Sequence, residues 1–350
     1  MFRRPCRWIG TLIVCLATAE LVARLDDWLF FDAPILSTPD RQHDLELHAS
    51  DTIRGKPNGA HRKWKLNADG FRGPAIDPRP VGKRVMILGA SETFGLFESE
   101  GHEYPALLRK HLADIEIVNA AVAGMALPTM TNYWNVWASR YHADVVMIYP
   151  SPHFYLDNKP PHAIAPQPEI NEPAPPRSRF GERLVDTFKQ ASILKAIRVR
   201  LLLRRELEGK GDDYLFGATP PPDRLAQFEA DLEKLADAIE KAGSRPVLIT
   251  HAFKTSSPPE TRDHAELEYF RVFFPRATVP SSPAFDTAAR QVTIDLGKRR
   301  GWPVIDAAAK LTGKREWFGD PVHFNDQGSE QMAKLLAAAV PALFAEKGGR

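Results

Sequence analysis

Two short segments of the chain carry side chains whose types and spacing could support nucleophilic chemistry. In the first, Ser91 follows Gly89 and Ala90 directly after an apolar run. Small neighbours let the backbone turn sharply and leave the hydroxyl and the amide of Ser91 facing an open crevice. In the second, Asp320 precedes His323 by three positions. A carboxylate at that spacing can accept a hydrogen bond from the imidazole and fix its tautomer, so that the other ring nitrogen can take a proton from a serine.

Each segment taken alone also fits an ordinary structural role. Ser91 is a suitable N-cap residue for a helix that begins after the strand. Asp320 would serve as an N-cap acid before the last helix, with His323 exposed in the loop. The two segments point to chemistry only together, because a neutral serine is a weak nucleophile that needs an adjacent base.

The apolar pattern predicts alternating strands and helices that would position these segments. Five short runs are typical of buried strands: residues 84–89, 115–119, 144–149, 246–250 and 303–306. Helical patterns lie between and after them, at residues 104–113, 130–141, 223–242, 285–300 and 326–344. Strands separated by helices indicate parallel crossovers, and strands that are apolar throughout indicate burial on both faces. We therefore expect a three-layer α/β/α sandwich around a mainly parallel, five-stranded sheet.

A proline-rich stretch interrupts this alternation. Seven prolines lie between Asn158 and Arg177, a density that no helix or central strand tolerates. A helix with a basic second half is predicted to follow, from Glu182 to Glu206. We interpret residues 158–222 as an insertion between the third strand and its helix. The basic helix would either bind anionic headgroups or an acidic polymer, or pack as a lid with a solvated basic face.

The N-terminus has the pattern of an export or anchoring segment. Arg3, Arg4 and Arg7 precede an apolar run that continues to Leu25 and is interrupted by Glu20. A helix over residues 8–25 would be ~27 Å long, close to the ~30 Å hydrocarbon core of a bilayer. The segment is either a retained signal anchor or a cleaved signal peptide, with a soluble core helix as a third alternative. In the first two cases the arginines stay on the cytoplasmic side and the body is exported.

In combination these features resemble the GDSL esterases, also called SGNH hydrolases. The resemblance rests on Gly-x-Ser after the first strand, on Asp-x-x-His before the last helix, and on the lead-in Asn67-Ala68-Asp69-Gly70-Phe71-Arg72-Gly73. It covers residues 67–344 apart from the proline-rich stretch, and it is closest in kind to exported bacterial members with an N-terminal membrane segment. It implies a flavodoxin-like sheet that carries a serine esterase or an O-acyltransferase. Ser91 would be the nucleophile, His323 the base and Asp320 the residue that orients the base.

The resemblance also implies an oxyanion hole, which this sequence matches in part. Besides the amide of Ser91, Gly124 after the second strand corresponds to the glycine whose amide the family uses. The family's asparagine after the third strand has no counterpart at the nominal position. Asn158 lies further along, and Ser151 and His153 are rival donors. Loss of one such donor lowers the rate by ~10²–10³ without abolishing the reaction.

Other side chains near strand ends are weaker candidates for substrate binding. Asp157 and His251 each follow a strand, where a crevice is expected in a parallel sheet, as do Ser151 and His153. A solvated loop acid and a packing or capping histidine are the corresponding structural alternatives for Asp157 and His251. Ala90 replaces the aspartate of the family's Gly-Asp-Ser, which affects the mechanism little because that aspartate is not the charge partner of the base.

The composition excludes several other classes of protein. With 46 Lys and Arg against 44 Asp and Glu, the net charge of +2 gives no whole-chain attraction to nucleic acid. The cysteines, Cys6 and Cys15, both lie near the N-terminus, so the body has neither a disulfide framework nor a thiolate metal site. The sequence contains no HExxH, P-loop or GxGxxG motif, so neither a metal nor a nucleotide cofactor is predicted.

We therefore divide the chain into an anchor or signal peptide (residues 1–25), a lead-in (26–80) and a hydrolase-like domain (81–346) that contains the insertion (158–222). We expect a serine hydrolase that acts on ester bonds, without a cofactor, as an O-acetyl esterase or O-acyltransferase on an envelope or secreted polysaccharide. The domain would lie in the periplasm or outside the cell, anchored to the cytoplasmic membrane. The alternative is a catalytically weak polysaccharide-binding or envelope-assembly protein on the same fold.

Overall fold

A parallel sheet forms the centre of the molecule. The computed structural model describes residues 3–31, 33–36, 44–49, 52–77, 80, 82–157, 161, 178–190 and 192–345. Within them the central strands are β5 (Lys83–Gly89), β6 (Ile115–Asn119), β7 (Val145–Tyr149), β8 (Arg245–Ile249) and β9 (Val304–Ile305). They lie in the order β6-β5-β7-β8-β9, and every neighbouring pair is parallel. Each predicted strand is present with its ends within one residue, and the order is flavodoxin-like.

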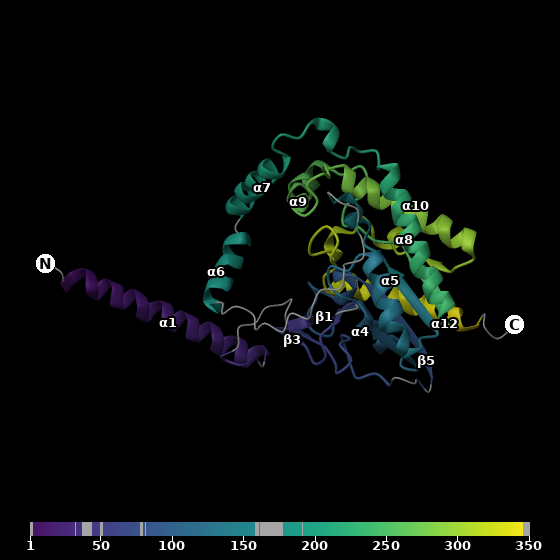
Figure 1. Ribbon diagram of the computed structural model, residues 1–350, viewed down its shortest axis with the longest axis horizontal. Helices are drawn as coiled ribbons and strands as arrows, with labels where there is room; N and C mark the ends of the chain where they lie inside the picture. The colour runs from purple at the N-terminus through teal and green to yellow at the C-terminus, as the bar shows by residue number, and fades with distance from the viewer. Residues whose placement is uncertain are drawn as a thin grey trace.

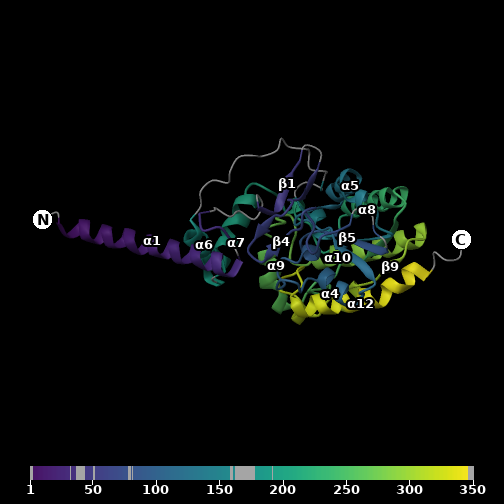
Figure 2. The ribbon, with the colours of Figure 1, turned by 90° about the horizontal axis from the view of Figure 1, so that it is seen from below.

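Helices cover both faces of this sheet (Figures 1 and 2). On one face lie α5 (Leu127–Val136), α8 (Pro222–Lys241) and α10 (Ser281–Arg300), and on the other lie α4 (Tyr104–His111) and α12 (Asp326–Ala345). The side chains of β5 alternate between the two cores, with Met86 and Leu88 in one and Val85 and Ile87 in the other. All four are fully buried, as expected for a strand covered on both faces. The expected three-layer α/β/α sandwich is confirmed.

Short helices complete the described chain. The predicted helix over residues 130–141 divides into α5 and a 3₁₀ turn, η1 (Ala138–Tyr141), and α10 begins four residues before its predicted start. The other short helices and 3₁₀ turns are α3 (Ser91–Phe94), η2 (Pro152–Leu156), η3 (Asp212–Tyr214), η4 (Thr261–Asp263), α9 (His264–Phe270), α11 (Ala308–Leu311) and η5 (Arg315–Trp317). Elements this short contain too few turns for apolar periodicity to reveal them.

The lead-in forms two small antiparallel ladders, which the sequence did not reveal. They pair β1 (Glu46–His48) with β2 (Ile53–Gly55), and β3 (Ala60–His61) with β4 (Trp64–Lys65). The lead-in then reaches the central sheet, because Arg72 forms an antiparallel bridge with Asn119 at the end of β6.

The turn at Asn67 explains the residue types of the lead-in motif. The side-chain oxygen of Asn67 accepts hydrogen bonds from the amides of Asp69 and Phe71, both at 2.9 Å. Gly70 has φ +83°, and a Cβ there would lie 2.1 Å from the carbonyl oxygen of Gly55. Only glycine fits this position, because the left-handed backbone and the close approach of β2 both exclude a side chain.

The N-terminal helix α1 (Arg3–Phe31) runs six residues beyond the predicted Leu25. Its portion Trp8–Phe31 is long and apolar enough to cross a membrane, with a mean hydropathy of 1.7 over its most apolar window, a test that signal sequences also pass. The helix projects away from the sandwich in Figures 1 and 2.

The insertion contacts the C-terminal part of α1. The predicted helix over residues 182–206 corresponds to α6 (Arg179–Gln190) and α7 (Ser192–Leu207), on either side of residue 191, which lies outside the described residues. The Glu20 carboxylate accepts hydrogen bonds from the amides of Arg179 and Phe180 at 3.1 and 3.0 Å, at the start of α6. Asp27, which is buried, forms ion pairs with Arg179 and with Arg183. Polar groups on one side of α1 therefore bind the insertion.

Candidate active site

A tight turn after β5 presents Ser91. The strand ends at Gly89, Ala90 is the N-cap, and Ser91 is the first residue of α3. A Cβ at position 89 would lie 2.0 Å from Thr93 Oγ1, so the glycine allows α3 to fold back against the strand end. Ser91 therefore follows the N-cap position and is not the N-cap residue that its sequence context also allowed. Its side chain is partly exposed at the carboxyl end of the sheet.

Ser91, His323 and Asp320 form a continuous hydrogen-bonded row. Ser91 Oγ lies 2.9 Å from His323 Nε2, and His323 Nδ1 lies 2.8 Å from Asp320 Oδ2. The other oxygen of Asp320 accepts hydrogen bonds from the amides of Val322 and His323, at 3.0 and 2.8 Å. With Nδ1–H donating to Asp320, Nε2 is left as an acceptor for the serine proton. The sequence placed these three residues in one site, and the structure brings them together.

The electrostatics of this row favour a basic imidazole. Burial opposes ionisation of Asp320, but its hydrogen bonds from His323 and from two amides hold the pKa of the carboxyl below its usual value. Burial would lower the pKa of His323, but the Asp320 carboxylate outweighs it and raises the pKa above the ordinary value. The Asp320 carboxylate therefore stabilises an imidazolium that would form when His323 takes the serine proton.

The loop after α3 covers His323 and is fastened to α12. Phe97 stacks on the imidazole, with ring centroids 4.8 Å apart and planes 13° from parallel. The next residue, Glu98, is buried and accepts a hydrogen bond from Ser329 Oγ at 2.7 Å. Burial raises the pKa of Glu98 to about 7. The backbone amide of Ser99 donates to Asp326 Oδ1 at 2.7 Å.

The loop that carries Gly124 lies beside the end of β5. The amide of Ala120 donates to the carbonyl of Ile87 at 3.0 Å, and that of Val122 donates to Gly89 at 3.3 Å. These bonds bring the loop alongside the residues that immediately precede Ser91. Gly124 has φ +81°, a conformation that favours glycine. The amide of Gly124 therefore stays a candidate oxyanion donor.

Three of the other predicted site residues are buried. Ser151, His153 and His251 are 4%, 7% and 2% exposed, so they lie below the surface of the crevice. Asp157 follows η2 and is partly exposed, whereas Asn158 lies outside the described residues. The roles proposed for Asp157 and Asn158 stay predictions.

These three buried residues converge on Glu92, a residue that the sequence reasoning missed. Ser151 Oγ donates to Glu92 Oε1 at 2.8 Å, and the Nε2 atoms of His251 and His153 lie 3.5 and 3.8 Å from the same oxygen. Glu92 is 1% exposed, and its Oε2 lies 3.2 Å from Ser91 Oγ. The available signal was an acid directly after the serine, in a turn otherwise made of small and uncharged residues.

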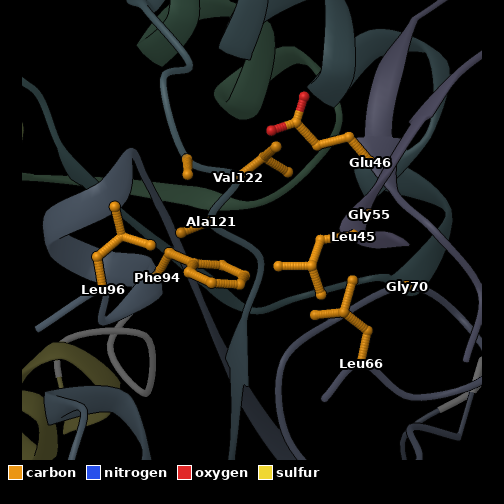
Figure 3. A pocket seen from close by; sticks show the side chains of 10 residues that line it. Leu45, Glu46, Gly55, Leu66, Gly70, Phe94, Leu96, Ala121 and Val122 are labelled. Carbon is orange, nitrogen blue, oxygen red and sulfur yellow. The ribbon is translucent and has the colours of Figure 1, made fainter. Parts of the chain in front are cut away.

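An apolar pocket lies between the lead-in and the strand-end loops (Figure 3). Leu45 and Leu66 of the lead-in face Phe94 of α3, and Ala121 and Val122 from the loop after β6 complete the lining. Phe94 belongs to the same short helix as Ser91. The lead-in is therefore part of the wall next to the nucleophile turn.

Comparison with known proteins finds similarity only at the level of solved structures. No protein-family model matches the chain. No curated protein matches it either. A lipase/acylhydrolase from Enterococcus faecalis is 14% identical, with 74% of this chain and 95% of that chain covered and a TM-score of 0.44.

Two further structures are of the same kind. A lipolytic protein of the G-D-S-L family from Desulfitobacterium hafniense is 11% identical, covers 73% of this chain and 99% of its own, and has a TM-score of 0.43. A catalytic mutant of an acetylxylan esterase from Geobacillus stearothermophilus is 13% identical, covers 74% and 94%, and has a TM-score of 0.42. The activity of this chain is argued below from its own residues.

Proposed function

We propose that this protein is a serine hydrolase that acts on ester bonds. The observation that carries the proposal is the row Ser91–His323–Asp320, in which consecutive groups are 2.9 and 2.8 Å apart at the carboxyl end of a parallel sheet. A nucleophile hydrogen-bonded to a base, which is itself oriented by a third group, is the arrangement that activates a neutral serine.

The reaction proceeds by two acyl transfers. His323 Nε2 takes the proton of Ser91 as its Oγ attacks the ester carbonyl, and the carbonyl oxygen becomes an oxyanion. The amides of Ser91 and Gly124 donate to that oxygen. As the tetrahedral intermediate collapses, His323 returns the proton to the leaving alcohol and the acyl group stays on Ser91. The oxygen of water, or of a sugar hydroxyl in a transferase, then attacks the acyl carbonyl and gives its proton to His323. His323 passes that proton to Ser91 Oγ as the bond between Ser91 and the acyl group breaks.

The residues after β7 support a modest rate of ester hydrolysis. Ser151 and His153, two of the predicted oxyanion donors, are buried and directed toward Glu92. A site with one donor fewer is expected to be ~10²–10³ slower than a full one. A catalytically weak polysaccharide-binding protein on this fold is the second candidate that this observation favours.

The N-terminal helix supports a substrate that lies outside the cytoplasm. The apolar portion Trp8–Phe31 of α1 would anchor the chain in the cytoplasmic membrane, with Arg3, Arg4 and Arg7 on the cytoplasmic side and the hydrolase domain in the periplasm or outside the cell. O-acetyl groups on an envelope or secreted polysaccharide are the substrates that this location offers. The proposed activity needs no cofactor.

The test uses the full chain in detergent, because α1 contacts the insertion through Glu20 and Asp27. Turnover of p-nitrophenyl acetate is measured for the parent and for the Ser91→Ala and His323→Ala variants. We expect each substitution to lower kcat/KM by ~10³-fold or more. Ser256→Ala and His264→Ala, which alter exposed residues, are the matched controls and should keep the parental rate.

A fluorophosphonate probe separates the two candidate functions. Covalent labelling of the parent but not of the Ser91→Ala variant supports an activated serine. A parent that neither turns over the ester nor reacts with the probe contradicts the hydrolase, and binding of acetylated polysaccharide would then be measured by calorimetry.

A further inference from the structure

A buried cluster of metal-binding side chains lies directly behind the nucleophile turn. Glu92, His153 and His251 each offer one ligand atom, and these atoms all lie within 4.8 Å of one another. Glu92 lies on α3, His153 lies on η2, and His251 is the second residue after β8. The sheet brings these three separate segments together. No local motif could therefore have revealed the cluster in the sequence.

The spacing of the ligand atoms fits a small divalent cation. Zinc binds imidazole nitrogens and carboxylate oxygens at ~2.0–2.2 Å, so adjacent ligands of a tetrahedral ion lie ~3.3–3.5 Å apart. Glu92 Oε1 lies 3.5 Å from His251 Nε2 and 3.8 Å from His153 Nε2. These two contacts are within a few tenths of an ångström of the ligand spacing, and the two imidazole nitrogens lie within 4.8 Å of each other.

Hydrogen bonding leaves this cluster incomplete. His251 Nε2 is buried and its partner, Glu92 Oε1, lies 3.5 Å away at the outer limit of a hydrogen bond, whereas Nδ1 of His153 is buried and makes no hydrogen bond with the described residues. A buried polar atom without a partner is costly, so each such atom calls for an explanation. A cation bound by Glu92 and by the facing nitrogens of both rings would satisfy His251 Nε2.

The surrounding residues are placed as supports for metal ligands. His251 Nδ1 lies 2.5 Å from Asp286 Oδ1, the carboxylate–histidine contact that fixes the ring and makes its other nitrogen a better ligand. Ser151 Oγ donates to Glu92 Oε1 at 2.8 Å and so orients the carboxylate. Tyr149 stacks on His251, with ring centroids 5.3 Å apart, and closes one side of the cluster.

Charge balance points the same way. Glu92 and Asp286 supply two carboxylates within the cluster, and both are buried. A divalent cation held between them would carry the opposite charge of two carboxylates.

We propose that Glu92, His153 and His251 bind a divalent transition-metal ion, with Zn²⁺ as the best match. Two imidazoles and one carboxylate, with a carboxylate behind one imidazole, form a donor set suited to Zn²⁺. The ion joins the ends of β5, β7 and β8 beneath Ser91. It adds a structural element to the site, and its presence does not depend on the esterase activity proposed above.

The experiment measures zinc bound to the full chain in detergent. The protein is stripped with a chelator, loaded with Zn²⁺ alone, freed of excess metal on a desalting column and analysed by mass spectrometry of the element. We expect one zinc ion per chain in the parent and a loss of at least tenfold in occupancy in the His251→Ala and Glu92→Gln variants. His264→Ala, which removes an exposed histidine, should keep the parental zinc content.

Co²⁺ provides a readout that needs no variant. Loaded in place of zinc, it should give the visible absorption of a tetrahedral ion in the parent, and this absorption should disappear when Zn²⁺ is added. A parent that binds less than a tenth of an equivalent, or shows no cobalt absorption, overturns the proposal. So does zinc that is retained equally by His251→Ala and Glu92→Gln, since it would then be bound elsewhere. If these variants fail to fold, the cobalt spectrum of the parent decides the question.

Discussion

Phe97 lies flat on the imidazole of His323, with ring centroids 4.8 Å apart and planes 13° from parallel. The ring is 48% exposed, so it shields one face of the base from solvent while remaining part of the surface. Gly319 makes this position possible, because a Cβ there would lie 2.6 Å from the Phe97 ring. The stack holds the imidazole in the plane that joins Ser91 to Asp320.

Replacing Phe97 by alanine should weaken the base without unfolding the protein. An aromatic stack contributes ~0.5–1.5 kcal/mol, which corresponds to a loss of about 2- to 10-fold in kcat/KM for p-nitrophenyl acetate. Phe97→Leu should recover part of the rate because it restores apolar cover. Unchanged kinetics in the alanine variant would show that the stack does not hold His323.

The pH dependence of the reaction should reflect the raised pKa of His323. The imidazole must be neutral to act as a base, so kcat/KM should increase with pH and reach half its maximum above pH ~6.5, the ordinary value for histidine. Asp320→Asn removes the carboxylate that raises this pKa, so the midpoint should move to lower pH and the rate should fall by ~10³–10⁴. A midpoint at or below 6.5 in the parent would argue against this electrostatic arrangement.

Glu98 should make the protein less stable as the pH rises. Its pKa is raised from 4.5 to about 7 by burial, so the folded state keeps a proton that the unfolded state releases between these values. Because the folded state then binds more protons, the free energy of unfolding contributed by this group decreases from pH 4.5 to pH 7. Glu98→Gln should remove that decrease in a series of urea titrations. Glu316→Gln, at an exposed position, is the control and should leave the slope unchanged.

Arg72 should contribute strongly to stability through the loop after α3. Its guanidinium is 4% exposed, donates to the carbonyl of Gly95 at 2.7 Å and lies 3.2 Å from Glu103 Oε2. Arg72→Met keeps the apolar stem but leaves the Glu103 carboxylate buried without its cation. We expect a loss of ~3–5 kcal/mol in the free energy of unfolding.

An exposed arginine provides the comparison for Arg72. Arg262 pairs with Glu260 at 2.9 Å, but both side chains are about two-thirds exposed. Removal of a pair in solvent is expected to cost ~0–1 kcal/mol, so Arg262→Met should unfold at nearly the parental urea concentration. Equal losses in the two variants would contradict the role assigned to Arg72.

The parts of the fold that follow from local pattern were predictable, and those that depend on distant contacts were not. The five strands were found because each has a mainly apolar core and ends at or next to a polar or turn-forming residue. Ser91 and His323 were selected because small residues flank the serine, an aspartate precedes the histidine by three positions, and the two segments together resemble a known family. The lead-in ladders were missed because their strands have only two or three residues, too few to show an alternation.

The contacts of Glu92 could not be predicted from the sequence, because its partners lie far from it along the chain. His153 and His251 were proposed as candidate site residues, because residues that follow parallel strands usually face the crevice, with packing or capping as the alternative for His251. Both are buried, because the side chain of Glu92, next to Ser91, points into the interior and contacts both imidazoles after the ends of two other strands. The partner that holds His251, Asp286, lies on α10 and gives no signal of its own in the sequence.

The N-terminal helix α1 is connected to the sandwich through the insertion. Glu20 binds the first amides of α6, Asp27 pairs with Arg179, and α7 in turn packs against α9 of the sandwich. Helices α6 and α7 therefore connect α1 with the sandwich, as the arrangement in Figure 1 illustrates. If α1 spans a membrane as proposed, this connection would hold the sandwich at a set height above the bilayer, whereas a loose tether would let it move over a wide radius. The proposed activity would then suit esters on polymers that pass close to the membrane surface better than soluble esters that diffuse freely.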